Sequence, residues 1–358
     1  MKKKLTFLGI ETSCDETAAA VIQENYNGKA KVLSNIISSQ IKEHKKFGGI
    51  VPEIAARAHI ENIDFIIQEA LKKSKKNIND IDGVAATAGP GLVVCLNVGY
   101  NIGKSLAIFA NKPFIPINHL EGHALSPGIE SKISFPYLLL LVSGGHSQYI
   151  IVKGLNNYKQ IGTTIDDAVG EAFDKTSKIL NLGYPGGPSI EKFAKLGNKE
   201  SYNLPLPIIN RAGCNLSLSG LKTDVLRKSK NIKSTKDRYD MAASFQEAIN
   251  KILRKKTEVA MKIFQKEISK NSLRLFVVAG GVAANDSIRN NLKQLSKKMN
   301  FKTIFPSKQF CGDNAAMIAW AGIQRYKKKL FDNKKYFVRS RWPLDKNAPF
   351  LKGPGLKI

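Results

Sequence analysis

The sequence predicts an α/β protein built from a duplicated unit of strands and helices. Near the N-terminus, an apolar strand at residues 5–10 is followed by a polar turn, a returning strand at 17–23 and a third strand at 31–38. The same order recurs at residues 138–142, 147–152 and 158–162. A repeated order of elements indicates internal duplication. Hairpins also recur by chance, but the parallel order of the elements that follow makes chance the weaker explanation.

Helices and strands alternate through the rest of the first half. Pro52 is suited to the first turn of a helix, because proline lacks the N–H that this turn leaves unbonded. In order, the expected elements are a loop at 39–49, a helix from Pro52 to about residue 73, a strand at 83–87, a glycine turn at 89–91, a helix at 92–110 and a strand at 114–117.

The second half continues in the same alternating style. Its expected elements are a helix at 167–180, a short helix from Ser189, an irregular segment at 198–220, one or two helices within 236–270, a strand at 273–279, a glycine turn at 280–285 that leads into a helix, a strand at 303–305 and a helix at 315–326. A length of 358 residues allows two domains at about 100–200 residues each.

Several protein classes are excluded by composition. No apolar run reaches the roughly 18–20 residues that a membrane span needs, so no membrane association is expected. The apolar stretch at the N-terminus is interrupted by Glu11 and Asp15, which argues against a secretory signal peptide. The four cysteines are far apart and form no C-x-x-C motif. A reduced, cytoplasmic protein is the simplest interpretation.

The net charge is strongly positive. Lys and Arg total 56 against 29 Asp and Glu, which gives +27. Such an excess favours a polyanionic partner, with nucleic acid foremost. Because lysine dominates and Ile and Asn are frequent, an AT-rich genome is an alternative cause. The run from Lys222 to Arg238 is the most suggestive basic segment.

Two histidines four residues apart, His119 and His123, predict a metal site. On an α-helix this spacing places two side chains on one face, about 40° apart, where they can bind one ion. A third ligand must come from elsewhere, and Asp313, just before an expected helix, is the candidate. A helix N-cap would also explain this aspartate. A His/His/Asp set with open positions suits one divalent metal ion per subunit, Fe(II) first and Zn(II) second.

A zinc protease is the rival interpretation of the histidine pair. Its H-E-x-x-H signature places a glutamate beside the first histidine as general base. Here the order is H-L-E-G-H, and Glu121 is expected to point about 180° away from the mean direction of His119 and His123. Such a glutamate cannot act on a metal-bound water, so the protease reading is disfavoured.

Three glycine-rich turns indicate a nucleotide site. They are Gly89-Pro90-Gly91, Ser143-Gly144-Gly145 and Gly280-Gly281, and each follows or joins strands. Glycine allows backbone N–H groups to approach a phosphate closely. Neither a P-loop nor a G-x-G-x-x-G dinucleotide loop is present. A nucleotide is therefore expected in a cleft between two lobes, outside the P-loop and Rossmann classes.

These motifs together resemble the bacterial tRNA N6-adenosine threonylcarbamoyltransferases. The resemblance covers nearly the whole chain, in order, through Gly9 to Thr17, Val51 to His59, His119 to His123, Leu141 to His146, Thr164 to Lys175, Tyr184 to Pro188, Gly280 to Asn285 and Gly312 to Ala319. It implies an actin/Hsp70/sugar-kinase-like fold of two lobes. The expected division is an N-terminal lobe at 1–118, a C-terminal lobe with the metal and nucleotide site at 119–325, and a basic tail at 326–358 that packs back on the N-terminal lobe.

The resemblance also implies the reaction. The threonylcarbamoyl group of threonylcarbamoyl-adenylate passes to the exocyclic amine of the adenosine 3′ of the anticodon, in tRNAs that read ANN codons, and AMP is released. The tRNA would account for the basic excess. An inactive paralogue of the TsaB type and a small ATPase of the TsaE type are the implied protein partners. An actin-like ATPase or kinase without transfer activity is the alternative.

Site residues are carried over by motif position. His119, His123 and Asp313 would hold the metal. Archaeal and eukaryotic relatives have a metal-binding tyrosine at the place of Leu141, so fewer protein ligands are expected here. Because the amine nucleophile is weak, Asp15 or Glu16 in the first hairpin turn is the candidate general base. The residues expected to contact the nucleotide-like substrate are Leu141, Val142, Ser143, Gly144, Gly145, Asp174, Gly187, Glu191 and Asn285.

Overall fold

The computed structural model describes residues 4–269, 272–331 and 337–348. Its contacts divide the chain into two compact units. The first comprises Met1–Ile133 and Asp313–Leu344, and the second comprises Ser134–Gly312 and Asp345–Ile358. Within the described residues, none of the helices combines the length and the apolar character that crossing a bilayer requires.

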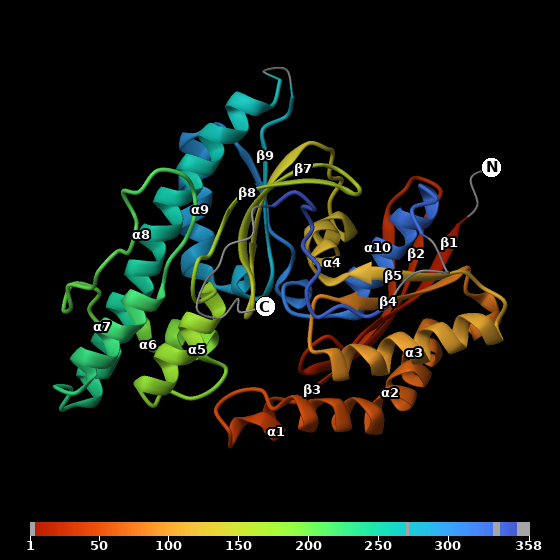
Figure 1. Cartoon of the computed structure of the whole chain (residues 1–358), viewed down its shortest axis with the longest axis horizontal. Coiled ribbons are helices and arrows are strands. Elements are labelled where there is room, and N and C mark those ends of the chain that lie inside the picture. The colour runs from red at the N-terminus through yellow and green to blue at the C-terminus, as the bar shows by residue number, and fades with distance from the viewer. Residues whose placement is uncertain (1–3, 270–271, 332–336, 349–358) are drawn as a thin grey trace. The chain divides into compact units, whose positions relative to one another are not determined.

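A five-stranded sheet forms the centre of the first unit (Figure 1). Its order is β3-β2-β1-β4-β5, with antiparallel pairs at β1–β2 and β2–β3 and parallel pairs at β1–β4 and β4–β5. The strands are β1 (Leu5–Glu11), β2 (Glu16–Glu24), β3 (Ala30–Ser39), β4 (Gly83–Gly89) and β5 (Phe114–Asn118). The helices are α1 (Ile41–Lys45), α2 (Pro52–Ser74), α3 (Val93–Phe109), α4 (His119–Leu125) and α10 (Ala315–Lys327), with short 3-10 turns η1 (Ile78–Asp80) and η2 (Ser126–Ile129).

Helices cover both faces of this sheet, which explains why β1 is apolar along its whole length. Successive side chains of a strand point to opposite faces. Leu8 and Ile10 pack in the cluster that includes residues of α2 and α3. On the other face, Phe7 packs against Tyr326 of α10, with ring centroids 5.5 Å apart. A Cβ on Gly9 would lie 2.3 Å from the Ala315 carbonyl oxygen, so glycine permits α10 to approach the strand.

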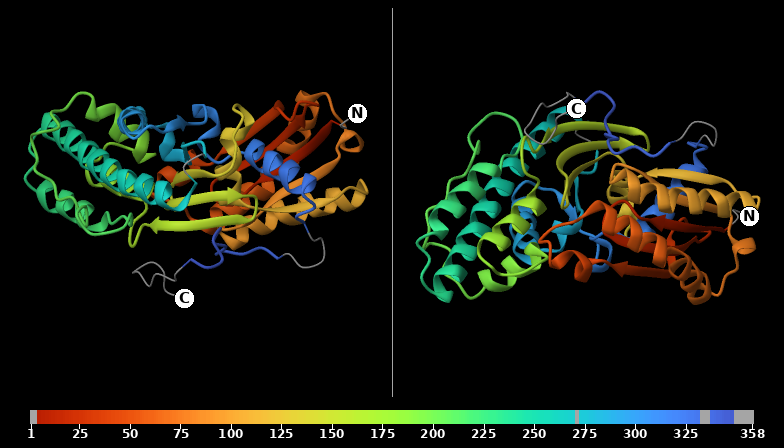
Figure 2. Two further views of the ribbon diagram at one scale, coloured as in Figure 1. Left: turned by 90° about the horizontal axis from the view of Figure 1, so that it is seen from above. Right: turned by 60° about the horizontal axis from the view of Figure 1, so that its bottom comes forward.

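The second unit repeats this sheet. Its order is β10-β9-β6-β7-β8, with antiparallel pairs at β6–β7 and β7–β8 and parallel pairs at β6–β9 and β9–β10. The strands are β6 (Tyr137–Val142), β7 (Ser147–Gly154), β8 (Asn157–Thr163), β9 (Leu275–Ala279) and β10 (Lys302–Ile304). The helices are α5 (Val169–Ile179), α6 (Gly186–Ala194), α7 (Ser219–Ser229), α8 (Thr235–Glu267) and α9 (Asp286–Lys298), with 3-10 turns η3 (Gly281–Ala284) and η4 (Lys308–Phe310). Figure 2 shows the long α8 with its neighbour α9.

The internal duplication is confirmed by the two sheets. Counting strands from the start of each sheet, both follow the order third, second, first, fourth, fifth. In both, the first three strands form antiparallel pairs and the fourth and fifth add in parallel. The shared order extends beyond the hairpins, so chance recurrence of hairpins does not explain it.

The unit boundaries differ from the predicted division at residue 118. Both α4 and α10 belong to the first unit. A Cβ on Gly122 would lie 2.9 Å from Ile318, so the absence of a side chain there lets the two helices pack closely. The predicted tail is also divided. Arg339 donates its backbone N–H to Ala88 in the first unit, at 2.8 Å, whereas Asp345 accepts from Gln160 in the second, at 2.8 Å. Residues 332–336 and 349–358 of the predicted tail lie outside the described residues.

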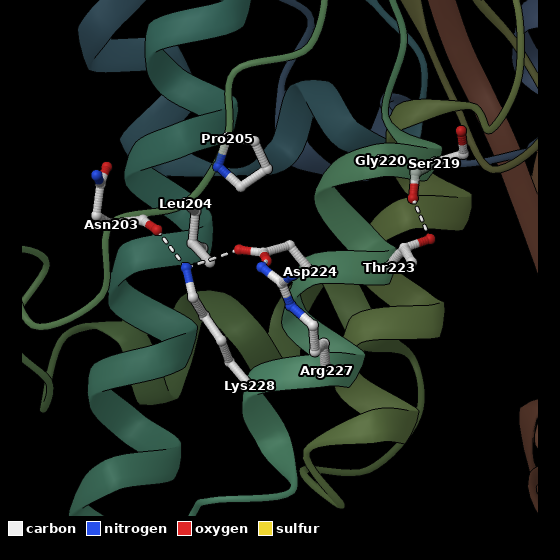
Figure 3. A pocket seen from close by; sticks show the side chains of 9 residues that line it. All are labelled: Asn203, Leu204, Pro205, Ser219, Gly220, Thr223, Asp224, Arg227 and Lys228. Atoms are coloured by element: carbon white, nitrogen blue, oxygen red, sulfur yellow. Dashed lines mark hydrogen bonds and ion pairs between the residues drawn. The ribbon is translucent and has the colours of Figure 1, made fainter.

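Helix α7 contains much of the basic run that the sequence singled out. The irregular segment expected up to residue 220 ends at this helix because Asp166 accepts hydrogen bonds from the backbone N–H groups of Leu218 and Ser219. A pocket of about 640 Å³ lies beside it (Figure 3). Arg227 and Lys228 line this pocket and both pair with Asp224, so a single carboxylate offsets part of their charge.

The short helix α1 lies where a loop was expected. It spans only five residues, Ile41–Lys45, which is too short for a helical hydrophobic pattern to be seen in the sequence. The buried side chain of His44 anchors it through a 3.1 Å contact with Gln40.

Candidate functional site

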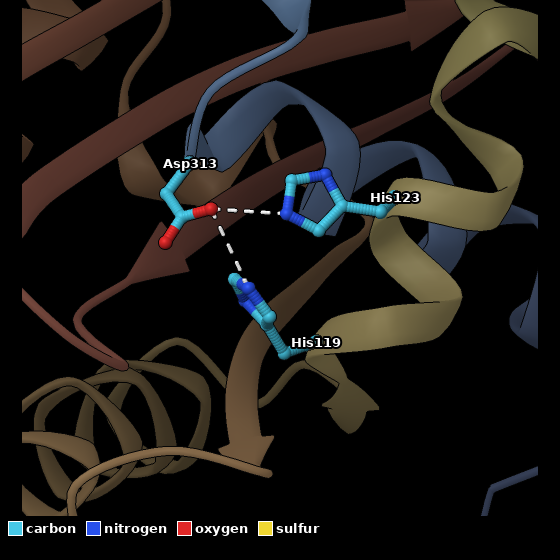
Figure 4. Close-up of side chains that lie close together, drawn as sticks. All are labelled: His119, His123 and Asp313. Atoms are coloured by element: carbon cyan, nitrogen blue, oxygen red, sulfur yellow. Dashed lines mark hydrogen bonds and ion pairs between the residues drawn. The ribbon is translucent and has the colours of Figure 1, made fainter. Parts of the chain in front are cut away.

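The two histidines of the predicted metal site lie on the seven-residue helix α4. The helix begins because Asn118 caps it, and the Asn118 side chain accepts from the backbone N–H groups of Leu120 and Glu121. The His119 and His123 rings come from the same side of the helix, with ring centroids 4.8 Å apart (Figure 4). The helical spacing argument is therefore confirmed.

Asp313 lies against both histidines. Its Oδ1 atom is 2.9 Å from His123 Nε2 and 3.4 Å from His119 Nε2. The alternative role as a helix cap is wrong, because Asn314 is the N-cap of α10 and accepts from the Met317 N–H. Asp313 is thereby available to the histidines.

The three side chains fit a divalent metal ion. Among the described residues, one ligand atom from each of His119, His123 and Asp313 lies within 4.8 Å of the others. Two imidazole nitrogens and one carboxylate form a set that zinc and iron both accept in proteins. The Asp313 side chain is 22% exposed, whereas those of the histidines are buried, so the cluster has one open side.

Strong electrostatic coupling joins these groups. Burial opposes the charge on Asp313, but His119 and His123 outweigh it and hold the pKa of the carboxyl well below its usual value. Burial likewise opposes the charge on His119, yet Asp313 and Glu11 raise its pKa well above the usual value. These carboxylates thus favour a positive charge between the side chains, and they would favour a bound cation for the same reason.

Glu11 is a neighbour of this cluster that the sequence analysis missed. It ends the apolar strand β1 and is 1% exposed. Its Oε2 atom lies 3.1 Å from His119 Nδ1 and accepts from the Thr87 hydroxyl at 2.5 Å. Burial opposes ionisation of Glu11, but His119 outweighs it and lowers the pKa of the carboxyl. Two signals for Glu11 were in the sequence: its place in the motif from Gly9 to Thr17, and its charge at the end of an apolar strand.

Glu121 confirms the argument against a protease. It is fully buried and receives a charge-assisted hydrogen bond from Arg325 Nε of α10. The carboxylate is therefore engaged with α10, as the helical direction of its side chain predicts. It is not placed as the general base of an H-E-x-x-H site.

Asp15 directly precedes β2 and Glu16 is its first residue, and these candidate general bases lie in the same unit as the candidate metal ligands. The turn is held by Gln40, whose backbone N–H donates to the Asp15 carbonyl at 3.0 Å. Burial, reinforced by Asp313 and Asp15, raises the pKa of Glu16 well above its usual value. A carboxyl group with a raised pKa is better suited to take up a proton near neutral pH.

The residues predicted to contact the substrate belong to the second unit. Leu141 and Val142 end β6, and the turn after them is closed by two hydrogen bonds between Ser143 and His146, at 2.8 and 3.2 Å. Gly280 follows the parallel strand β9 with φ of 98°, and a Cβ there would lie 2.3 Å from the Val142 carbonyl oxygen. Only glycine allows these two strand ends to approach so closely.

The remaining predicted contacts come from α5, α6 and the start of α9. Asp174 accepts from the Gly186 N–H at 2.7 Å, and Glu191 accepts from the Asp286 N–H at 2.7 Å. Asn285 caps α9 and donates to Gln246 at 2.8 Å. A Cβ built on Gly144, Gly145 or Gly187 would meet no atom within 4 Å, so open space borders these backbone segments.

Leu141, the residue that replaces a ligating tyrosine in the resemblance, is fully buried in β6. Its side chain has no atom that could bind a metal ion. The structure therefore brings the three predicted metal ligands together in one unit and the nine predicted substrate residues together in the other. Their functional roles stay predictions.

Comparison with known proteins identifies relatives along the whole chain. The family model of tRNA N6-adenosine threonylcarbamoyltransferase matches residues 31–320. A protein of that name from Pelagibacter ubique is 56% identical over 360 residues and covers 100% of both chains. Another from Rhizobium johnstonii is 49% identical over 355 residues and covers 98% of this chain and 97% of the relative.

Solved structures show the same fold at low sequence identity. HypF from T. kodakarensis covers 91% of this chain and 48% of its own, with a TM-score of 0.60 and 14% identity. Component A of (R)-2-hydroxyglutaryl-CoA dehydratase from Acidaminococcus fermentans covers 91% and 99%, with a TM-score of 0.51 and 15% identity. The fold is of the actin/Hsp70/sugar-kinase type. With a family match over most of its length and full-length relatives at about half identity, the chain belongs to the tRNA N6-adenosine threonylcarbamoyltransferases.

Proposed function

We propose that this tRNA-modifying acyltransferase uses threonylcarbamoyl-adenylate as its donor and releases AMP. The acceptor is the exocyclic amine of the adenosine 3′ of the anticodon in tRNAs that read ANN codons. The new bond joins this nitrogen to the carbamoyl carbon, while the bond from that carbon to the phosphate oxygen breaks. The single observation that carries the site assignment is the convergence of His119, His123 and Asp313 on one point.

One divalent metal ion is proposed at these three residues, with Fe(II) preferred over Zn(II). When bound, such a cation supplies Lewis-acid polarisation of the carbonyl and offsets the charge of the leaving phosphate. The chain supplies two nitrogen ligands and one oxygen ligand, and the open side at Asp313 leaves room for substrate. The absence of a ligating atom in Leu141 keeps the protein ligands at three in this proposal.

Glu16 is the proposed proton acceptor, with Asp15 as the alternative. The amine of adenosine must lose a proton as the carbon–nitrogen bond forms. A carboxyl group whose pKa burial raises well above the usual value holds that proton more readily than an exposed one. The proposed site for the adenylate is the second unit, where the glycines at 144, 145 and 187 leave space beside the backbone.

The decisive experiment supplies threonylcarbamoyl-adenylate and unmodified tRNA to the full chain, and detects the modified nucleoside by mass spectrometry. Asp313→Ala should lose both bound metal and transfer while it stays folded. Glu16→Gln should lose transfer but keep the metal. A metal-loaded, fully active Asp313→Ala variant would refute the metal proposal, and an active Glu16→Gln variant would move the base assignment to Asp15.

Partner proteins are proposed on the family resemblance. A TsaB-type inactive paralogue and a TsaE-type small ATPase are the candidates, in the cytoplasm. All four cysteines are free, as a reducing compartment would require. Large apolar side chains are exposed on the packed helices α2 and α3, which leaves surface that a protein partner could cover, namely Ile60, Phe65, Ile108 and Phe109. The transfer assay with and without each partner tests this: equal rates in all arms would count against a required partner.

A further inference from the structure

We propose that Glu11 is a positioning residue that fixes the ring of His119 for metal binding. The inference rests on the metal centre proposed above. It concerns a residue that does not itself bind the metal or the substrate. Its starting point is a difference between the two histidines of the cluster in what their second ring nitrogen contacts.

The second nitrogen of His119 faces a fixed carboxylate. Its Nδ1 atom lies 3.1 Å from Glu11 Oε2, while its Nε2 atom points to Asp313. The Ser13 hydroxyl lies 3.2 Å from the same Nδ1 atom. By contrast, His123 Nδ1 is buried and has no hydrogen-bond partner among residues 4–269, 272–331 and 337–348. Within the described residues, only His119 of the pair therefore has a carboxylate at its second ring nitrogen.

Glu11 itself is held rigidly. Its Oε1 atom accepts from the Ser13 backbone N–H at 2.5 Å, and its Oε2 atom accepts from the Thr87 hydroxyl at 2.5 Å. Glu11 ends β1 and Thr87 lies in the parallel strand β4, so the carboxylate is anchored to two strands of the central sheet. The bond to Ser13 also ties it to the turn that carries Asp15 and Glu16.

This arrangement selects one tautomer of His119. An ionised carboxylate only accepts hydrogen bonds, so Nδ1 of His119 must carry the proton. When Nε2 gives up its own proton to a bound metal ion, the lone pair of the neutral ring lies on this nitrogen, which faces Asp313. Carboxylates in this position beside a metal-binding histidine fix the orientation of the ring and increase its basicity.

Glu11→Gln removes this selection with little change in shape. An amide has one accepting oxygen and one donating NH₂ group. If the NH₂ group faced Ser13, two donors would oppose each other in a buried place. The less costly orientation turns the NH₂ group to Thr87, whose hydroxyl can accept, and to His119. His119 Nδ1 must then accept, which moves the ring proton to Nε2 and blocks the metal-binding lone pair.

The test measures the Kd for Zn²⁺ of the metal-free full chain by chelator competition. Glu11→Gln should bind Zn²⁺ about 10–100-fold more weakly than the parent. Glu121→Gln is the matched control, because it changes another buried carboxylate of the same unit that is engaged by Arg325 and not by a histidine. The control should keep the parental Kd, even if thermal unfolding shows that it is less stable than Glu11→Gln.

A Glu11→Gln Kd within about threefold of the parent would overturn the inference, as would an equal loss of affinity in Glu121→Gln. If Glu11→Gln does not fold, Glu11→Asp takes its place and only the direction of the change in Kd is used. Weaker Zn²⁺ binding supports the role of Glu11, and a parental Kd overturns it. A parent that binds Zn²⁺ no better than Asp313→Ala would instead refute the metal centre itself, and the inference with it.

Discussion

The buried ion pair between Glu121 and Arg325 offers a quantitative test of how α4, the helix that carries His119 and His123, is held. The Arg325 side chain is 8% exposed and that of Glu121 is fully buried. Arg325 also donates to the Leu330 carbonyl at 3.1 Å. Arg325→Met would remove the cation and leave a buried carboxylate next to an apolar side chain. Breaking a buried pair in this way costs about 3–5 kcal/mol of unfolding free energy.

Urea unfolding followed by tryptophan fluorescence measures this loss of unfolding free energy in the first unit, which contains the ion pair. Both tryptophans, Trp320 and Trp342, belong to the first unit. With a urea dependence of about 1–3 kcal/mol per molar, the midpoint for Arg325→Met should fall by on the order of 2 M. The double variant Glu121→Met/Arg325→Met should regain most of the stability, because apolar replacements of a buried pair are often neutral.

Two results would refute this reasoning. A loss below about 1 kcal/mol for Arg325→Met would mean that water or another group compensates the Glu121 charge, as at exposed ion pairs. A double variant no more stable than Arg325→Met would mean that the arginine contributes by packing and not by balancing the carboxylate. Lys327→Met is a comparison at a more accessible ion pair of the same unit, since the Lys327 side chain that pairs with Glu24 is 41% exposed. It should cost far less.

Three further outcomes are expected. Burial lowers the pKa of His59, so the folded state resists protonation of this side chain. The urea midpoint should therefore fall as the pH drops below 6.5, and it should fall less in His59→Gln. Burial raises the pKa of Cys95 and of Cys214 to about 11, so iodoacetamide at pH 8 should label both slowly in the native protein and rapidly in urea. The logarithm of the tRNA association constant should fall linearly with the logarithm of the salt concentration, by about 0.7–0.9 per phosphate contact, in filter-binding titrations. A flat line would exclude binding of the tRNA phosphates by lysine and arginine side chains.

Local patterns predicted most of the fold. The duplicated strand order was visible because each half opens with an apolar strand, a polar turn and a returning strand, and these signals lie within about 35 residues. Helix α7 was not predicted, since the residue that caps it, Asp166, lies more than fifty residues earlier in the sequence. The predicted boundary at residue 118 also differs from the observed one, because only tertiary packing shows that α4 and α10 belong to the same unit.

Part of the candidate site was predictable because it, too, shows a local pattern in the sequence. His119 and His123 are linked by helical spacing, which a sequence displays directly. Asp313 was identified by its place before a helix, and the structure confirms that it lies against both histidines. Glu11 was missed because its partners Thr87 and His119 lie 76 and 108 residues away. A charged residue at the end of an apolar strand is unusual, and this mismatch was one of two clues in the sequence.

The duplication explains why the predicted chemistry is divided between distant segments. Carboxyl ends of parallel strands meet at one edge of a sheet, where α/β proteins place their ligands. In the first unit, Glu11 ends β1 and His119 directly follows β5, so the metal cluster forms at that edge. In the second unit, Val142 ends β6 and Gly280 directly follows β9, so the predicted adenylate contacts form at the equivalent edge. The turn after the first strand carries the candidate acids in one copy and the glycines in the other. One ancestral edge thus accounts for both sites, with carboxylates and histidines selected where a cation is proposed and glycines where a phosphate is.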